Sequence, residues 1–192
     1  MIELINVKKS FGDKHVLNNF SAIFFEGANC LMGDSGIGKT TITNLLLGLI
    51  KAESGEIKGI QNKRINCVFQ ENRLIEELSA VKNMLLVCGK EKSVEAMALL
   101  CQMGLEDSTH CPVSTLSGGM KRRVAIARAL INPADIYIFD EPFKGLDDTR
   151  KDSVIDIIKN RTQNAVSIFI THDFSEAQAL NARVINMAVE KI

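Results

Sequence analysis

One segment constrains the fold of this chain more than any other, and it runs Gly33-Asp34-Ser35-Gly36-Ile37-Gly38-Lys39-Thr40. It fits the pattern G-x-x-x-x-G-K-[ST], a loop that wraps phosphate groups between a buried strand and a helix. Glycines let the main chain approach the ligand, and successive N–H groups then form an anion nest. We expect Lys39 to bind the β- and γ-phosphates of a nucleotide and Thr40 to offer a hydroxyl to Mg²⁺.

The flanks of this loop provide the context that the motif needs. A short, mostly apolar segment at 28–32 precedes it and is predicted to be a buried strand. The segment 41–50 follows it and is long enough for three helical turns. A glycine-rich turn without a ligand is the alternative, and these flanks argue against it.

Length and charge narrow the class of protein. A chain of 192 residues with 46% hydrophobic and 24% charged residues forms one domain, or one domain with a smaller lobe. Lys plus Arg equals Asp plus Glu, at 23 each. The chain therefore has no net positive charge that would attract nucleic acid, and we expect no nucleic-acid partner.

The cysteines and the N-terminus indicate a cytosolic protein. The five cysteines show no C-x-x-C spacing, so we interpret them as reduced core thiols, with a zinc site as the alternative. The N-terminus has no basic region followed by an apolar stretch, so no signal peptide is expected. No run approaches eighteen apolar residues, so a partner would have to span any membrane at which the chain acts.

Strand and helix patterns alternate along the chain, which predicts an α/β fold with a mostly parallel core sheet. The N-terminal strands are expected to form an antiparallel β portion. The change to helix formers after residue 70 predicts an inserted α-helical lobe at about 71–115, within a core of about 1–70 and 116–192. Strands are predicted at 2–7, 16–25, 28–32, 56–60, 65–69, 136–139, 166–170 and 184–187, with a turn at 10–14. Helices are predicted at 41–50, 78–87, 91–103, from about 120 to Pro133, at 148–161 and at 174–180.

Two acidic residues follow a strand of the predicted parallel sheet. Asp140 and Glu141 come directly after the apolar segment 136–139. Open α/β sheets bind ligands beyond the carboxyl ends of their strands, so both side chains should face the phosphate loop. One carboxylate can hold Mg²⁺, and its neighbour can accept a proton from an attacking water. A pair of acids that only caps a solvated loop is the alternative.

A second anion site is predicted at Ser117-Gly118-Gly119. Ser117 is a favourable N-cap, and the glycines expose N–H groups at the start of a helix. One nucleotide does not need two such sites from one molecule, whereas two copies facing head-to-tail could complete each other's site. Taken alone, the segment is also compatible with a plain helix cap.

The order of these motifs resembles the nucleotide-binding subunit of ABC transporters over essentially the whole chain. The motifs are Gly33 to Thr40, Gln70, Leu116-Ser117-Gly118-Gly119, Asp140-Glu141, Leu146-Asp147 and Thr171-His172-Asp173. The resemblance implies a P-loop NTPase fold that binds ATP and Mg²⁺.

It also implies roles around the loop. Phe11 corresponds to the aromatic that stacks on adenine, with a core phenylalanine at a strand end as the alternative. Asp140 corresponds to the Walker B acid and Glu141 to the general base. The expected nucleotide-binding residues are Phe11, Gly33, Asp34, Ser35, Gly36, Ile37, Gly38, Lys39, Thr40, Thr41, Ser117, Gly118, Gly119 and Asp147.

Further roles are implied outside the loop. Gln70 would contact Mg²⁺ and the attacking water, Asp147 would cross the dimer interface, and His172 would contact the γ-phosphate. Ser117 to Gly119 would bind the γ-phosphate held by the opposite subunit. The expected catalytic residues are Lys39, Gln70, Glu141 and His172, and the expected metal ligands are Thr40, Gln70 and Asp140.

Two positions depart from the common pattern. Met120 stands where the signature usually ends in glutamine, and Lys144 lies in a loop that usually carries small residues. The segments 69–74, 116–120 and 141–143 look most like the importer subfamily for nitrate, sulfonates and taurine, in which methionine is expected at this position. Only twenty residues follow His172, so we expect no C-terminal regulatory domain.

The resemblance implies an Mg²⁺-dependent ATPase that energises a membrane transporter, an importer of a small solute. Its expected partners are a second copy of itself, a transmembrane permease that the helical lobe contacts, and an extracytoplasmic solute-binding protein. It would lie on the inner face of the cell membrane. A non-transport ABC ATPase acting on ribosomes or DNA and a nucleotide-binding regulator without hydrolysis are the alternatives.

Overall fold

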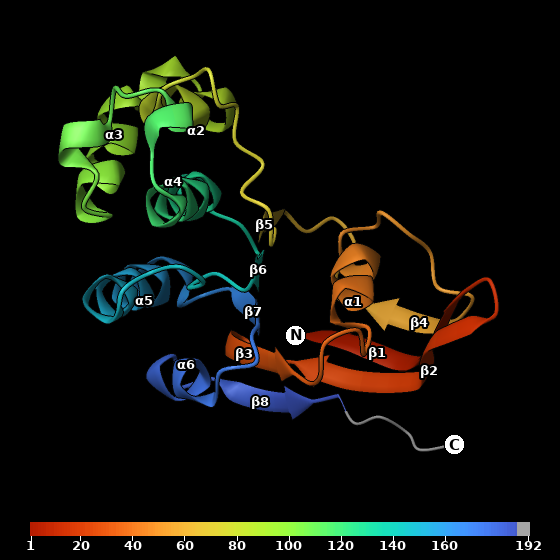
Figure 1. Cartoon of the computed structure of the whole chain (residues 1–192). Coiled ribbons are helices and arrows are strands. Elements are labelled where there is room, and N and C mark those ends of the chain that lie inside the picture. Colours follow the sequence, from red (N-terminus) through yellow and green to blue (C-terminus); the bar gives the residue numbers. More distant parts are fainter. Residues whose placement is uncertain (188–192) are drawn as a thin grey trace. The chain divides into compact units, whose positions relative to one another are not determined.

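The structure, a computed structural model, describes residues 1–187 and contains two compact units (Figure 1). The core unit comprises residues 1–65 and 134–140, together with the chain from 162 onward. The helical unit comprises residues 66–133 and 141–161. The segment of about 71–115, predicted as an inserted lobe, falls within the helical unit. That this segment forms a lobe of its own stays a prediction.

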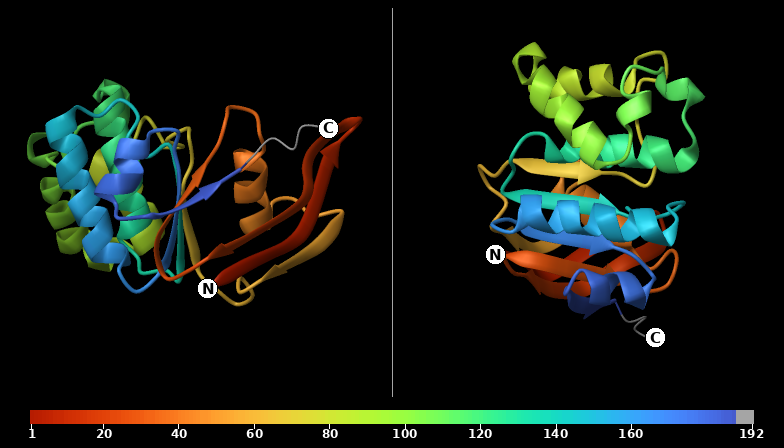
Figure 2. Two further views of the ribbon diagram at one scale, coloured as in Figure 1. Left: turned by 90° about the horizontal axis from the view of Figure 1, so that it is seen from below. Right: turned by 90° about the vertical axis from the view of Figure 1, so that its left-hand side faces the viewer.

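The core unit begins with an antiparallel sheet of strand order β2-β1-β4 (Figure 2). The strands are β1 (Ile2–Phe11), β2 (Lys14–Phe24) and β4 (Ser54–Lys58). In β1 the side chains of Ile2, Leu4 and Val7 are buried. Phe11 pairs with Lys14, so β1 continues through the region predicted as a turn, and the turn is only Gly12 and Asp13.

The core unit also contains a parallel sheet. Its strands β6 (Ile136–Asp140), β7 (Val166–Ile170), β3 (Gly27–Met32) and β8 (Arg183–Asn186) lie in this order. Every residue of β6 and β7 is buried, as the continuous apolar runs predicted. Ile170 is in register with both Asp140 and Leu31, so the carboxyl ends of three strands meet at one edge. β5 (Ile65–Val68) begins at the boundary of the two units.

The helices of the core unit are α1 (Lys39–Leu46) and α6 (Phe174–Ala179). Helix α1 is shorter than the predicted 41–50. The N–H of Gly48 donates to Leu45 O (3.1 Å) and that of Leu49 to Asn44 O (2.9 Å). Because Gly48 has φ of 69°, these two bonds form the Schellman pattern, which ends the helix.

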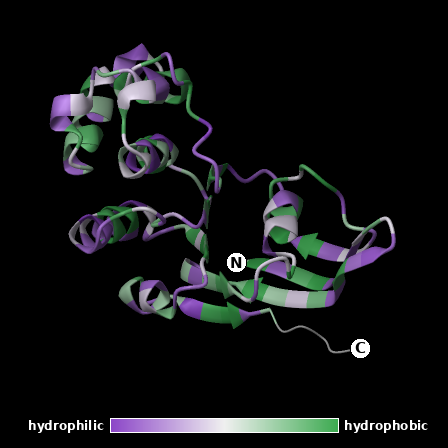
Figure 3. Cartoon of the chain, in the orientation of Figure 1, coloured by the Kyte–Doolittle hydropathy of each residue, from purple (hydrophilic) through white to green (hydrophobic). Residues whose placement is uncertain are grey.

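The helical unit contains α2 (Ala80–Cys88), α3 (Ser93–Gln102), α4 (Gly118–Leu130) and most of α5 (Asp148–Thr162). Helices α2, α3 and α4 pack against one another around Met84, Leu99 and Leu100, which are fully buried. In Figure 3 these helices carry both hydrophobic and hydrophilic residues, as expected of helices with one buried face. Within residues 1–187, no helix has the length and apolar character needed to cross a membrane.

Candidate functional site

The phosphate loop connects β3 to α1, as the motif requires. Gly38 has φ of 118° and Gly33 has φ of 152°. A Cβ on Gly38 would lie 3.0 Å from Val16 Cγ1, and one on Gly33 would lie 3.0 Å from the main-chain oxygen of Met187. Only glycine therefore fits these two positions without displacing β2 or the segment after β8.

The Lys39 ammonium lies against its own loop. Its Nζ donates to Gly33 O (2.7 Å) and to Asp34 O (2.8 Å). The side chain therefore turns back over the loop instead of extending away from α1. The positive charge of Lys39 and the positive end of the α1 dipole therefore lie at the same loop. Both would attract the negatively charged phosphates of a nucleotide.

A pocket of about 810 Å³ lies beside the loop. It is lined by loop residues 34–37 and by residues of β2, among others. Phe11, at the end of β1, is 51% exposed, and Lys9 Nζ lies 5.4 Å from the centre of its ring. This exposure agrees with a stacking role for Phe11 and disagrees with the alternative of a core phenylalanine.

The carboxyl edge of the parallel sheet brings several predicted site residues into one row. Asp140 ends β6 and is 7% exposed, and the phosphate loop follows β3. His172 follows β7 and is exposed. Its neighbours are fixed, because Asp173 N donates to Thr171 Oγ1 (3.1 Å) and Asp173 Oδ1 accepts from Ser175 N (2.8 Å).

Two oxygen donors of the core unit suit Mg²⁺. Thr40 is exposed at the start of α1, and the Asp140 carboxylate ends β6. A magnesium ion in a nucleotide site takes one or two protein oxygens, waters and phosphate oxygens. No cluster of three or more His, Cys, Asp or Glu suited to a metal occurs in residues 1–187, and such a magnesium site does not need one. Gln70, the third predicted ligand, belongs to the helical unit.

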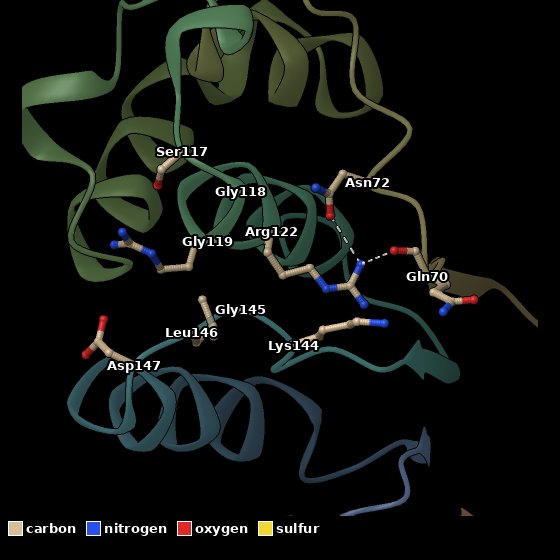
Figure 4. A pocket seen from close by; sticks show the side chains of 11 residues that line it. Gln70, Asn72, Ser117, Gly118, Gly119, Arg122, Lys144, Gly145, Leu146 and Asp147 are labelled. Atoms are coloured by element: carbon tan, nitrogen blue, oxygen red, sulfur yellow. Dashed lines mark hydrogen bonds between the residues drawn. The ribbon is translucent and has the colours of Figure 1, made fainter. Parts of the chain in front are cut away.

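The helical unit has a pocket of its own, of about 490 Å³ (Figure 4). Ser117 Oγ accepts a hydrogen bond from Met120 N (3.3 Å), which confirms the predicted N-cap of α4. A Cβ on Gly119 would lie 2.8 Å from Gly145 O, so the start of α4 packs directly on the loop before α5. The lining residues are Gln70, Asn72, Ser117, Gly118, Gly119, Arg122, Arg123, Lys144, Gly145, Leu146 and Asp147.

Asp147 lies at the opposite side of this pocket from Gln70 in Figure 4. Its Oδ1 accepts from Arg150 N (3.0 Å), so Asp147 caps the N-terminus of α5. The side chain also remains exposed. The cap holds the carboxylate at the surface in a defined orientation, which suits a residue expected to face a second copy.

The Glu141 carboxylate accepts hydrogen bonds from Gln70, a predicted site residue, and from Lys144, which departs from the family pattern. Its Oε2 lies 3.3 Å from Gln70 Nε2 and 2.9 Å from Lys144 Nζ. The main chain of Glu141 has φ of 47°, a left-handed conformation that is uncommon for this residue type. The structure therefore brings together Gln70 and Glu141, which lie 71 residues apart. Lys144, one of the two departures from the family pattern, forms an ion pair with the expected general base.

Two buried arginines of this pocket were not predicted from the sequence. Arg122 is a basic residue of α4, yet it is only 3% exposed. Its neighbour Arg123 is also buried and donates to the carbonyls of Met103 and Gly104. Burial lowers the pKa of Arg123 from its ordinary value. Basic residues off an apolar stripe are normally solvated, so the sequence could not have identified either arginine.

Comparison with known proteins identifies the family. A family model described as "ABC transporter" matches residues 17–144. This match spans more than half of the chain, so the chain belongs to the ABC transporter family. The P-loop NTPase fold expected from the sequence is confirmed by the dimeric cassette MJ0796, which has a TM-score of 0.86 and 30% identity over 97% of this chain and 94% of that one.

The curated relatives that the chain resembles differ in length. The "Ergothioneine transport ATP-binding protein EgtV" of Helicobacter pylori is 32% identical over 100% of this chain and 99% of its own length. The "Fe(3+) ions import ATP-binding protein FbpC" of Escherichia coli O157:H7 is 36% identical over 97% of this chain. The chain spans only 59% of that relative's length. The "Aliphatic sulfonates import ATP-binding protein SsuB 1" of Paraburkholderia xenovorans is 33% identical over 96% of this chain.

Proposed function

We propose that this chain is the ATP-binding and ATP-hydrolysing subunit of a membrane ABC transporter. The observation that carries the proposal is the phosphate loop at the same sheet edge as Asp140 and His172, in a chain of this family. The family assignment supports ATP as the nucleotide. A cassette related to this chain at 29% identity has been solved after hydrolysis, with ADP and phosphate bound.

The transporter is proposed to be an importer of a small solute. The names of the relatives FbpC and SsuB 1 contain the word import, for iron and aliphatic sulfonates respectively. The segments 69–74, 116–120 and 141–143 resemble the sulfonate-type subfamily. The subunit itself is not expected to contact the solute, so the identity of the solute is set by the other subunits.

Within the core unit, binding and orientation of ATP are assigned to the loop. Its N–H groups and Lys39 bind the phosphates, Phe11 stacks on the adenine, and His172 contacts the γ-phosphate. Thr40 and Asp140 would hold Mg²⁺, and the predicted contact of Gln70 with the ion stays a prediction. The bound ion would neutralise charge on the phosphate oxygens.

In the helical unit, Glu141 is assigned as the general base. It accepts a proton from the attacking water, and Gln70 donates to the same carboxylate and so orients it. Lys144 competes for this carboxylate oxygen, because it forms the shorter contact. We expect the Glu141–Lys144 contact to open when water and nucleotide are in place.

A second copy is proposed to complete each site. The pocket of the helical unit offers the Ser117 hydroxyl and the N–H groups of Gly118 and Gly119 at the N-terminus of α4. These donors suit the γ-phosphate of a nucleotide held by another copy, and Asp147 lines the same pocket. Both structures of the MJ0796 cassette are dimeric, which supports an assembly of two copies. The head-to-tail orientation is part of our proposal.

Transport requires partners that span the membrane. We assign the segment of about 71–115 to contact with a transmembrane permease, which would hold the chain at the inner face of the membrane. Exposed apolar residues of this segment, Ile75, Leu86, Val87 and Val94, are available for such a contact. An extracytoplasmic solute-binding protein would complete an importer.

Two substitutions test the proposal when MgATP turnover and ATP affinity are both measured. Glu141→Gln should lower turnover by at least about 100-fold because the base is lost, while ATP binding persists. Lys39→Ala should instead weaken ATP binding by at least about tenfold. Lys58→Met removes an exposed lysine of β4 and serves as the control with wild-type behaviour. Undiminished turnover of Glu141→Gln would remove Glu141 from its role, and unchanged affinity of Lys39→Ala would remove the loop from ATP binding.

A further inference from the structure

The most buried charged side chain next to the helical-unit pocket is that of Arg122. It belongs to α4 and is 3% exposed, although α4 begins at the pocket surface. A buried guanidinium is stable only when its N–H groups are hydrogen-bonded. Its partners therefore show what this residue holds in place.

One group of partners lies directly after β5. Arg122 NH1 donates to Phe69 O (2.5 Å), to Asn72 Oδ1 (3.2 Å) and more weakly to Gln70 O (3.4 Å). Figure 4 shows the guanidinium pointing toward Asn72 and the main chain of Gln70. One nitrogen of Arg122 thus fixes the main chain from which the Gln70 side chain extends.

The other group of partners lies directly after β6. Arg122 Nε donates to Pro142 O (3.1 Å), and NH2 donates to Glu141 O (2.8 Å). The same planar group therefore holds two segments that are about 70 residues apart along the chain. A guanidinium is rigid, so it fixes the distance between these segments in a way that a flexible ammonium cannot.

This geometry matters for the two side chains that the segments carry. Gln70 Nε2 lies 3.3 Å from Glu141 Oε2. Glu141 has a left-handed main chain, a conformation that persists only where surrounding contacts enforce it. The bond from Arg122 to Glu141 O is one such contact.

We propose that Arg122 is a positioning residue for hydrolysis, which fixes the main chains of Gln70 and Glu141 relative to each other. The inference rests on the proposed function, since it gives Glu141 the role of base. Arg122 acts through these two residues, and no contact with nucleotide is assigned to it.

Arg128 provides a matched control on the same helix. It donates through NH1 to Arg73 O (2.8 Å) and through NH2 to Asn72 O (3.1 Å). It therefore anchors the segment after β5 in the same chemical way. Neither of these two bonds reaches Glu141 or Pro142, so Arg128 does not set the distance between the two segments.

The test compares Arg122→Gln, Arg122→Lys and Arg128→Gln for MgATP turnover, ATP affinity and thermal unfolding. Arg122→Gln should lower kcat about 10- to 100-fold, because small misplacement of catalytic groups has effects of this size. ATP affinity should stay within about twofold, since the loss concerns the chemical step. Arg122→Lys should not restore kcat, and Arg128→Gln should keep kcat within about threefold of wild type.

Several outcomes would overturn the inference. These are a folded Arg122→Gln variant with wild-type kcat, restoration of kcat by Arg122→Lys, and an equal loss of kcat in Arg128→Gln. If Arg122→Gln does not fold, Asn72→Ala removes one side-chain partner of the guanidinium and should lower kcat, and wild-type kcat there would contradict the inference. A wild-type chain without turnover would instead contradict the proposed function itself.

Discussion

At the scale of single residues, burial decides the chemistry of Cys30. This residue lies in β3 and has no exposed surface. Burial, and secondarily the charge of Glu176, raises the pKa of its thiol to about 12. Because the thiolate is the reactive form, Cys30 should be inert near neutral pH. All five cysteines are free thiols in the structure, and Cys101 is exposed.

Alkylation tests this expected difference in reactivity between the buried Cys30 and the exposed Cys101. With iodoacetamide at about pH 8, Cys101 should be modified first, and Cys30 should react only after unfolding. Peptide mass spectrometry over a time course gives the order of modification, and urea-unfolded protein gives the rate without burial. Equal rates for Cys30 and Cys101 in the folded protein would contradict the account.

The Asp135 carboxylate should make stability depend on pH. Its oxygens accept from Arg64 N (2.9 Å) and Lys63 Nζ (3.1 Å), which lowers its pKa below the ordinary value. A lowered pKa stabilises the fold above the unfolded-state pKa of about 3.9, and this contribution is lost as pH falls through the folded-state pKa. Asp135→Asn should therefore be less stable than wild type at neutral pH, and the difference should shrink in acid. Urea unfolding at several pH values measures it, and a difference that grows in acid would contradict it.

Residues were predictable from sequence where a local pattern fixes their role. Lys39 and Ser117 stand at helix starts, and their contacts lie within six residues along the chain. Arg122 was not predictable, because its acceptors lie 20 and 53 residues away and the fold alone brings them together. The Lys144 ion pair with Glu141 joins residues only three apart, but the sequence does not indicate the left-handed main chain of Glu141 beside it.

At the scale of elements, the first turn of α4 contains two glycines with different surroundings. A Cβ on Gly118 would meet no atom within 4 Å, whereas one on Gly119 would lie 2.8 Å from Gly145 O. Gly118→Ala should keep or raise the unfolding free energy, by up to about 1 kcal/mol, because alanine favours the helix. Gly119→Ala should lower it, since the loop before α5 must move. Thermal unfolding of both variants measures this, and equal effects would show that α4 does not pack on Gly145.

Elements were predicted best where pattern and packing agree. The strand Val166–Ile170 has the predicted bounds, because a continuous apolar run lies buried in a parallel sheet. The prediction failed at α1, which ends at Leu46 although the apolar run continues to Ile50, and at β1, which continues to Phe11. Pairing of Phe11 with Lys14 extends β1, and such pairing depends on the partner strand and not on local sequence.

At the scale of the whole molecule, the chain carries two distinct sets of groups suited to phosphate. The phosphate loop belongs to the core unit, and Ser117 to Gly119 belong to the helical unit. The order of the motifs allowed the family to be predicted from sequence. The contact of a second copy could not be derived from one chain, so head-to-tail assembly rests on the proposal and its test.

The molecular mass of Glu141→Gln with ATP tests this assembly most directly. The substitution removes the proposed base, so bound ATP should persist and hold two copies together. Light scattering on a sizing column with MgATP should give twice the chain mass of 21.1 kDa, and the single mass without nucleotide. Adding Gly118→Asp to Glu141→Gln places a negative charge where a phosphate is expected, and should return the mass to one chain while ATP still binds. A single-chain mass for Glu141→Gln saturated with ATP would contradict the claim that a second copy completes the site.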